Sequence, residues 1–147
     1  MKSLWEESAR RELKDRLGHL QATAQPRWGK FNAPQMLTHL GSAMRMANGE
    51  IRTASKNLPI RFTPLKQLII YWLPFPKGAP TAPELLNREP GDWAEGVAEV
   101  RGQIDAFAAR DPNAPWPEHP AFGKLTTKSW GVLTYRHIDH HLRQFGA

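Results

Sequence analysis

The sequence of 147 residues contains no cysteine, and this absence removes three kinds of chemistry. Without a thiol the chain forms no disulfide, offers no thiolate to a zinc ion and has no cysteine nucleophile. It also lacks a long apolar run, because the richest stretch, residues 68–75, is far shorter than the about 20 residues that cross a bilayer. The charged start, with Lys2, Glu6 and Glu7, does not fit a signal peptide. We therefore expect a cytoplasmic protein with no membrane partner.

Acidic residues are fewer than basic ones, 14 against 20, which gives a net charge of +6. Such a balance indicates a nucleic-acid partner only where basic side chains cluster. The densest basic group, within residues 6–16, instead alternates with acidic residues at the spacing of ion pairs along a solvated helix face. We expect no nucleic-acid partner and a single domain over residues 1–147, a length that supports one core.

Apolar residues recur at spacings of three and four in four long segments, as in amphipathic helices. These segments are residues 4–21, 32–49, 92–111 and 126–146, and a shorter segment, 65–73, predicts a buried helix. Prolines in residues 74–91 and 112–125 predict loops, the first of which could cover a pocket. No segment alternates as a strand does. The sequence predicts an all-α four-helix bundle with one extra short helix and long Pro-rich loops.

The last segment carries two histidines, His137 and His141, four residues apart. On a helix their Cβ atoms lie about 5–6 Å apart and face the same way. His39 lies on the inward side of the second segment. Three imidazoles from two helices could hold one divalent ion and leave a coordination position open. Two alternatives stay open: buried histidines that are satisfied by hydrogen bonds within the protein, and histidines exposed to solvent.

Other side chains on the last segment share the inward face of the histidine pair or flank it. Gln144 lies one turn beyond His141, where its amide could orient a metal ligand or a substrate. The residues that we expect to contact the ligands or a substrate are Gln144, Trp130, Thr134 and His140.

The remaining expectations concern polar and aromatic residues around this face. Trp28 is expected near the site, and Asp139, on the opposite side of the last helix, is expected to face solvent. His119 is expected at the surface or in a loop. Proton transfer has only two weak candidates, His140 and Glu118.

Two groups of motifs resemble a known family. They are Trp28-x6-Gln35-Met36-Leu37-x-His39-Leu40 in the first half of the chain, and Phe122-Gly123-x-Leu125-Thr126, Trp130-Gly131 and His137-x-x-His140-His141-x-x-Gln144-Phe145-Gly146 in the second. In order and spacing they resemble the DinB-like superfamily of small bacterial metal-binding four-helix bundles, and an uncharacterised branch of it. The resemblance implies His39, His137 and His141 as ligands, zinc or nickel as the ion, and a low-molecular-weight thiol as a cosubstrate in related transferases and isomerases.

These observations predict a divalent-metal-binding DinB-like protein, a metal-dependent thiol transferase or hydrolase that acts on a small-molecule substrate. The alternative is a non-catalytic metal-binding or stress-associated interaction module. An apolar helix face leaves a homodimer open in either case.

Overall fold

The computed structural model describes residues 1–147 and contains five α-helices, two 3₁₀ helices and no strand. The long helices are α1 (Glu7–His19), α2 (Ala33–Ala47), α4 (Trp93–Ala109) and α5 (Thr127–Gln144). The short elements are α3 (Leu65–Tyr71), η1 (Pro59–Arg61) and η2 (Pro83–Leu85). The prediction of an all-α chain is confirmed, and no helix end differs from its expected position by more than three residues.

Three of the long helices begin at side chains that accept a hydrogen bond from the first turn. Asn32 Oδ1 accepts from the Gln35 amide at 2.8 Å, and Gln35 Oε1 accepts from the Asn32 amide at 2.9 Å, which completes a capping box. Asp92 caps α4 through the Glu95 amide at 2.9 Å, and Thr126 caps α5 in the same way. These bonds fix where each helix starts, because they satisfy amides that have no partner within the helix.

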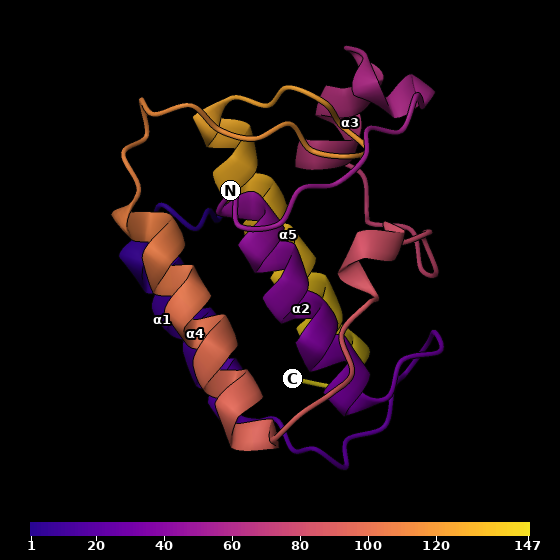
Figure 1. Ribbon diagram of the computed structural model, residues 1–147, viewed down its shortest axis with the longest axis vertical. Helices are drawn as coiled ribbons and strands as arrows, with labels where there is room; N and C mark the ends of the chain where they lie inside the picture. Colours follow the sequence, from indigo (N-terminus) through magenta and orange to yellow (C-terminus); the bar gives the residue numbers. More distant parts are fainter.

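Helix α1 packs against α4 and α5, and α2 packs against the same two helices. In Figure 1, α4 lies in front of α1, and α2 lies in front of α5. The sequence colours show that α2 and α5 run in opposite directions, so the first half of α2 lies beside the last half of α5. The first two helices along the chain are therefore not neighbours, and the pair that carries the histidines is formed by residues about a hundred positions apart.

A single apolar core fills the space between the four long helices. Each helix contributes side chains that are fully buried, and burying one such side chain stabilises the fold by about 1.5–3 kcal/mol. The fully buried aliphatic and aromatic residues include Leu13, Leu17, Met36, Leu40, Ile104, Phe107, Ile138 and Leu142.

Helix α3 corrects one expectation, because it is not a buried helix: three of its residues are exposed and three are half-buried. Only Ile70 is buried within it, packed in a small cluster with Phe122, Val132 and Leu133. The core between the long helices is already filled, so α3 contacts the rest of the protein through one side alone. The spacing of apolar residues in a sequence does not distinguish a buried helix face from an unpartnered one.

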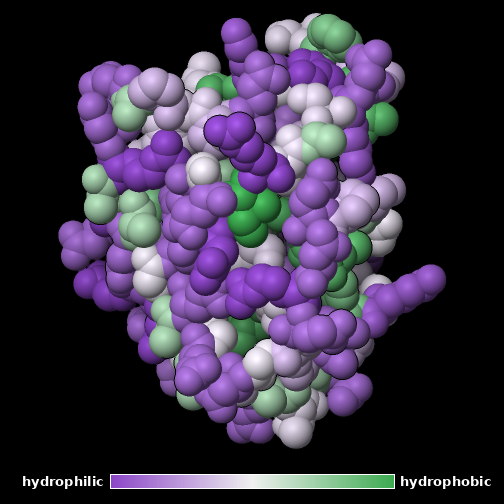
Figure 2. All heavy atoms as spheres, in the orientation of Figure 1, coloured by the Kyte–Doolittle hydropathy of each residue, from purple (hydrophilic) through white to green (hydrophobic).

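The face of the molecule shown in Figure 2 is mainly hydrophilic. In the view of Figure 2, polar residues cover most of α2 and α4, with apolar atoms showing between the helices and near the end that carries α3. None of the helices combines the length and the apolar composition needed to cross a bilayer.

Gly131 marks the place where the N-terminal segment crosses α5. Its carbonyl accepts a hydrogen bond from the Leu4 amide at 3.0 Å, and Trp5 Nε1 donates to the Thr127 carbonyl at 2.9 Å. A Cβ atom at position 131 would lie 2.4 Å from Trp5 Cδ1 and 2.4 Å from Ser3 Oγ. Only glycine lets the segment pack this closely.

We therefore expect Gly131→Ala to lower the free energy of unfolding by about 1–3 kcal/mol through overpacking. The matched control is Gly102→Ala in α4, where no atom lies within 4 Å of the added Cβ. That change should instead stabilise the protein by about 0.5–1 kcal/mol, because alanine favours the helix. Urea unfolding measures both values, and equal effects of the two substitutions would contradict the predicted contact.

Candidate metal centre

Three histidines converge where α2 meets α5. The candidate ligand nitrogens of His39, His137 and His141 all lie within 4.8 Å of one another. The Nε2 atoms of His39 and His137 are 3.2 Å apart. Two nitrogens bound at about 2.1 Å to one tetrahedral ion lie about 3.4 Å apart, so this separation fits a shared ion. The three histidines could therefore hold a metal ion, and the geometry expected from the sequence is present.

The helix pairing explains why they meet. His39 lies in the first half of α2, and His137 and His141 lie in the last half of α5. Because the two helices are antiparallel, these halves lie side by side (Figure 1). His39 is 4% exposed, and the other two rings are partly buried. Buried apolar residues adjoin the three histidines along both helices, among them Leu40, Ile138 and Leu142.

Gln144 determines which nitrogen of His141 is free. Its amide nitrogen donates to the Trp28 carbonyl at 2.7 Å, so its Oε1 atom is the acceptor that faces His141. That oxygen lies 2.8 Å from Nδ1 of His141. Nδ1 therefore carries the proton and Nε2 keeps a free lone pair. Metal-binding histidines are oriented by a hydrogen bond of this kind.

A glycine makes this contact possible. Gly29 has φ of +81°, a conformation that residues with a side chain rarely adopt. A Cβ atom there would lie 2.6 Å from Gln144 Nε2. Glycine at position 29 thus lets the Trp28 carbonyl reach the amide that orients His141.

His39, unlike His141, has no side chain that forms a hydrogen bond with its Nδ1 atom. Nδ1 is buried and has no hydrogen bond of normal geometry, although the backbone of Leu85 in η2 is near enough to raise the pKa of the ring against the effect of burial. In the metal-free protein one of the facing Nε2 atoms of His39 and His137 must donate to the other. An ion between them would need both lone pairs, and the proton on His39 would then sit on Nδ1, toward Leu85.

Phe31 covers part of the centre and was not predicted. Its ring centroid lies 5.3 Å from that of His39 and 6.1 Å from that of His141. The residue comes directly before the helix cap Asn32, and an apolar residue at this position commonly packs over the first turns of its helix. This rule could have predicted from the sequence that Phe31 packs near His39.

The other side of the centre holds His140 and residues from two loops. The His140 ring lies 5.5 Å from the Trp28 ring and 6.0 Å from the Phe75 ring, and the Lys77 ammonium lies 4.6 Å from the Trp28 ring. Trp28 is thus near the site, as the sequence led us to expect. Phe75 and Lys77 belong to the Pro-rich segment 74–91, which therefore reaches the histidines. No periodic pattern marks these two loop residues in the sequence.

Two other residues of the inward face, Thr134 and Trp130, lie nearer the start of α5 than the histidines do. Thr134 and Trp130 are both buried, one and two turns before His137. The Trp130 ring contacts His119 at 5.6 Å and Trp116 at 6.2 Å, and its Nε1 atom has no hydrogen-bond partner. The structure thus brings Gln144 and His140 against the three histidines, and it places Trp130 in a neighbouring aromatic cluster.

His119 lies in a loop, as expected, and it is half-buried. Paired backbone hydrogen bonds with Gly123, at 2.9 and 2.8 Å, close a turn that folds the ring inward. Nδ1 accepts from the amides of Ala121 and Phe122 at 3.1 and 3.3 Å. Burial lowers the pKa of His119 to about 3. This turn spans only five residues and has no helical repeat, so the spacing of apolar residues did not predict it.

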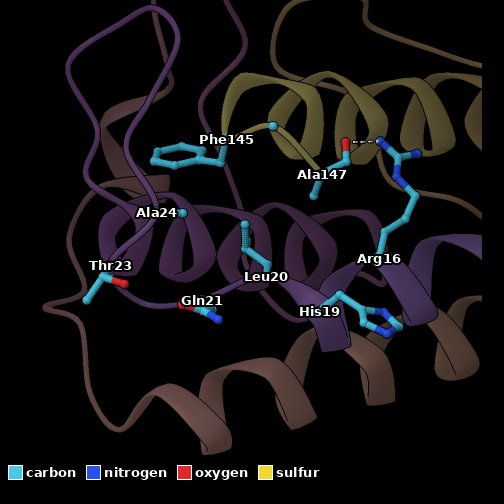
Figure 3. Close-up of a pocket in the computed structure, with 9 residues that line it drawn as sticks. Arg16, His19, Leu20, Gln21, Thr23, Ala24, Phe145 and Ala147 are labelled. Atoms are coloured by element: carbon cyan, nitrogen blue, oxygen red, sulfur yellow. Dashed lines mark hydrogen bonds between the residues drawn. The ribbon is translucent and has the colours of Figure 1, made fainter.

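A hollow at the end of the molecule is separate from this centre (Figure 3). It has a volume of about 660 Å³ and lies between the end of α1 and the C-terminus. The lining residues include Arg16, His19, Leu20, Gln21, Phe145 and Ala147, and none of the three converging histidines.

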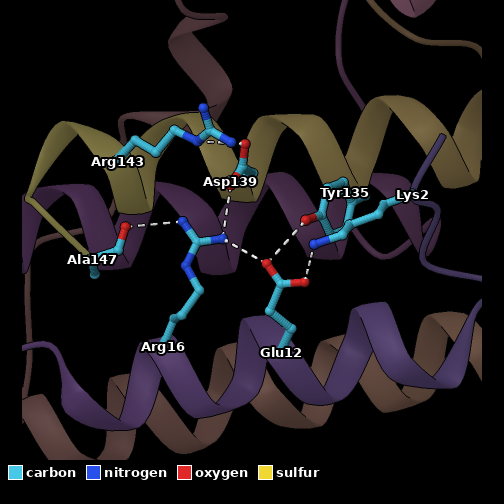
Figure 4. Close-up of polar contacts among 7 residues, drawn as sticks. All are labelled: Lys2, Glu12, Arg16, Tyr135, Asp139, Arg143 and Ala147. Carbon is cyan, nitrogen blue, oxygen red and sulfur yellow. Dashed lines mark hydrogen bonds and ion pairs between the residues drawn. The ribbon is translucent and has the colours of Figure 1, made fainter.

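Asp139 corrects a second expectation, because it faces α1 and not solvent (Figure 4). Its Oδ1 atom pairs with Arg16 Nη1 at 2.7 Å, and its Oδ2 atom pairs with Arg143 Nε at 3.0 Å. Arg16 also pairs with Glu12 at 3.4 Å, and Glu12 accepts from Tyr135 Oη at 3.3 Å. Asp139 was expected to face solvent because the sequence does not show that α1 covers the side of α5 opposite the histidines.

Burial keeps the three imidazoles neutral. Desolvation, with repulsion from His141, lowers the pKa of His39 to about 3. Desolvation also lowers the pKa of His141 to about 4, against the opposing hydrogen bond to Gln144, and lowers that of His137 well below its ordinary value. Neutral rings have the lone pairs that a metal ion requires.

These pKa values predict acid sensitivity of the metal-free protein. Unfolded histidine takes up a proton near pH 6.5, whereas folded His39 does so near pH 3, so protons favour unfolding between these values. We expect the free energy of unfolding to fall as the pH drops below about 6.5, by up to about 1.4 kcal/mol per pH unit for this residue. Urea unfolding between pH 7.5 and pH 5, with chelator present, measures this slope.

His39→Gln should reduce the slope, whereas His19→Gln, at an exposed position on α1, should leave it unchanged. The interpretation is wrong if the His39 variant and the unmodified chain have the same pH profile.

Comparison with known proteins gives one result. The family described as protein of unknown function (DUF1569) matches residues 7–147. No curated protein and no solved structure matches the chain. Because the family match spans nearly the whole sequence, the chain belongs to the DUF1569 family.

Proposed function

We propose that this protein is a DinB-like four-helix bundle, formed by α1, α2, α4 and α5, that binds one divalent metal ion through His39, His137 and His141. The observation that carries the proposal is the convergence of three histidine nitrogens within 4.8 Å, with one ring oriented by Gln144. The motifs around these residues, which resemble those of the DinB-like superfamily, support the same ligand set.

Zinc or nickel is the proposed ion. The candidate ligand group consists of imidazoles alone, and these suit zinc, nickel and copper better than calcium or magnesium, which prefer oxygen ligands. When bound, the ion supplies Lewis acidity at the coordination position that three ligands leave open. The chain holds the ligands neutral by burial, orients His141 through Gln144 and shields two of the rings with Phe31.

As an enzyme, the protein would be a metal-dependent thiol transferase or hydrolase of a small molecule, with a low-molecular-weight thiol as the cosubstrate of the transferase. His140 is the titratable side chain beside the ligands that remains for proton transfer. Its ring centroid lies 5.4 Å from that of His141, and burial lowers its pKa. A neutral imidazole at this place can accept a proton at neutral pH.

One observation favours the alternative, a non-catalytic metal-binding or stress-associated interaction module. Glu118, the other candidate for proton transfer, pairs with Arg61 at 3.4 Å, and Asp139 of the last helix pairs with Arg16 at 2.7 Å. Neither is free to act as a general base. Proton transfer then depends on His140 alone.

Metal content tests the ligand set. Protein purified without chelator should contain about one zinc or nickel ion per chain, and His137→Ala should reduce this below about 0.2, as measured by elemental mass spectrometry. His19→Ala is the matched control and should keep the metal, because His19 lies exposed on α1. Gln144→Leu should bind the metal about 10–100-fold more weakly, because His141 loses its orienting partner. Retention of metal by the folded His137 variant would reject the site.

Turnover separates the two functions. We expect metal-loaded protein to accelerate the transfer of a small thiol to an electrophile such as 1-chloro-2,4-dinitrobenzene, or the hydrolysis of a nitrophenyl ester. His141→Ala should abolish this rate and His19→Ala should retain it. A protein that holds about one ion per chain and accelerates none of these reactions is the interaction module.

A further inference from the structure

Helix α3 and its flanks carry the most exposed aromatic residues of the chain. Trp72 is 77% exposed and Phe62 is 64% exposed, whereas most large apolar residues are buried. Three leucines beside them are also exposed. We call this surface the α3 face, and its residues are Phe62, Leu65, Leu68, Trp72 and Leu73.

The α3 face points away from the rest of the protein. At 100° per residue, Leu65, Leu68 and Trp72 lie within about 60° of one another around the helix axis. Ile70, on the opposite side, is the residue buried against Phe122, Val132 and Leu133. The helix therefore uses one side for the fold and leaves an apolar side without a partner, near the end of the molecule (Figures 1 and 2).

Polar anchors hold α3 in this orientation. Arg136 of α5 donates to the backbone carbonyls of Ile69, Ile70 and Leu73, at the end of α3. Tyr71 Oη and Ser129 Oγ lie 2.8 Å apart, which fixes the inner side of the helix to α5. Hydrogen bonds to α5 therefore hold the helix that carries the α3 face in place.

The chain segment that carries this face is basic. Residues 51–83 contain no acidic residue and five basic ones, Arg52, Lys56, Arg61, Lys66 and Lys77. Lys66 Nζ donates to the Lys124 carbonyl at 2.9 Å, so the exposed side chain of Lys124 lies in the same region. Glu118 pairs with one of the five, Arg61. Lys66 and Lys124 therefore place positive charge beside the α3 face, whereas Lys77 lies over the Trp28 ring.

We propose that the α3 face docks onto an anionic lipid surface, with Trp72 and Phe62 entering the headgroup region and the neighbouring lysines facing the lipid charges. Exposed tryptophan, phenylalanine and leucine beside lysine and arginine are typical of segments that lie in the membrane interface. The lack of a spanning helix does not bear on such contact, which requires only a surface. Docking of this kind does not depend on a bound metal.

A second copy of the chain suits the face less well. A two-fold interface brings the same surface of both partners together, so the basic groups of one copy would approach those of the other. Like charges at an interface oppose association, whereas anionic headgroups attract each basic residue and raise affinity about fivefold for each one near the surface. The charge thus favours lipid over self-association.

Co-sedimentation of the full chain with vesicles tests the proposal. We expect binding to vesicles of phosphatidylcholine with 30% phosphatidylserine, at least tenfold weaker binding to phosphatidylcholine alone, and loss of binding in high salt. Phe62→Ser/Trp72→Ser should weaken binding at least tenfold without loss of helical content, because both side chains are exposed. Leu86→Ser, at a 49% exposed leucine outside the α3 face, is the matched control and should bind normally.

Three results would overturn the proposal. One is the absence of binding to anionic vesicles, and another is equal binding to both vesicle types. The third is a dimer in sedimentation velocity that the double substitution dissociates, which would assign the α3 face to a second copy of the chain.

Discussion

The antiparallel contact between α2 and α5 is the constraint on which the rest of this structure depends. It removes three imidazoles from water and sets two of their Nε2 atoms 3.2 Å apart. Buried rings at this separation cannot all be protonated, and one buried nitrogen of His39 is left without a normal hydrogen bond. Such an arrangement costs stability in a metal-free protein. A shared cation between the rings would remove that cost, which is why the cluster points to metal binding more strongly than any one histidine does.

Helix α5 organises the molecule because each of its sides has a different partner. The histidine side meets α2, and the side of Asp139 meets α1 through Arg16. Arg136, which directly precedes His137, secures the end of α3. Its guanidinium also lies 4.7 Å from the Phe75 ring, which in turn contacts His140. The residues that flank the ligands along the chain are therefore the ones that fix the surrounding elements.

The long connection between α2 and α4 contributes to two regions at once. Its first part carries the exposed α3 face, and its second part brings Phe75, Lys77 and Leu85 to the histidines. A segment rich in proline can serve both because it does not need to continue a helix. The proposed lipid contact and the proposed metal centre thus share one connection, which the Arg136 hydrogen bonds hold against α5.

The sequence by itself determined the helices, their caps and the pairing of His137 with His141 on one face, because spacing of three and four and capping side chains are local properties of the chain. The meeting of His39 with this pair needed the contact between α2 and α5. Tertiary structure decided what covers each helix. It turned Asp139 toward α1, folded His119 inward, left α3 exposed and brought Phe31 and Phe75 to the histidines. These outcomes depend on which helices become neighbours and on how the loops close, and contacts between residues far apart in sequence leave no periodic signal in the chain.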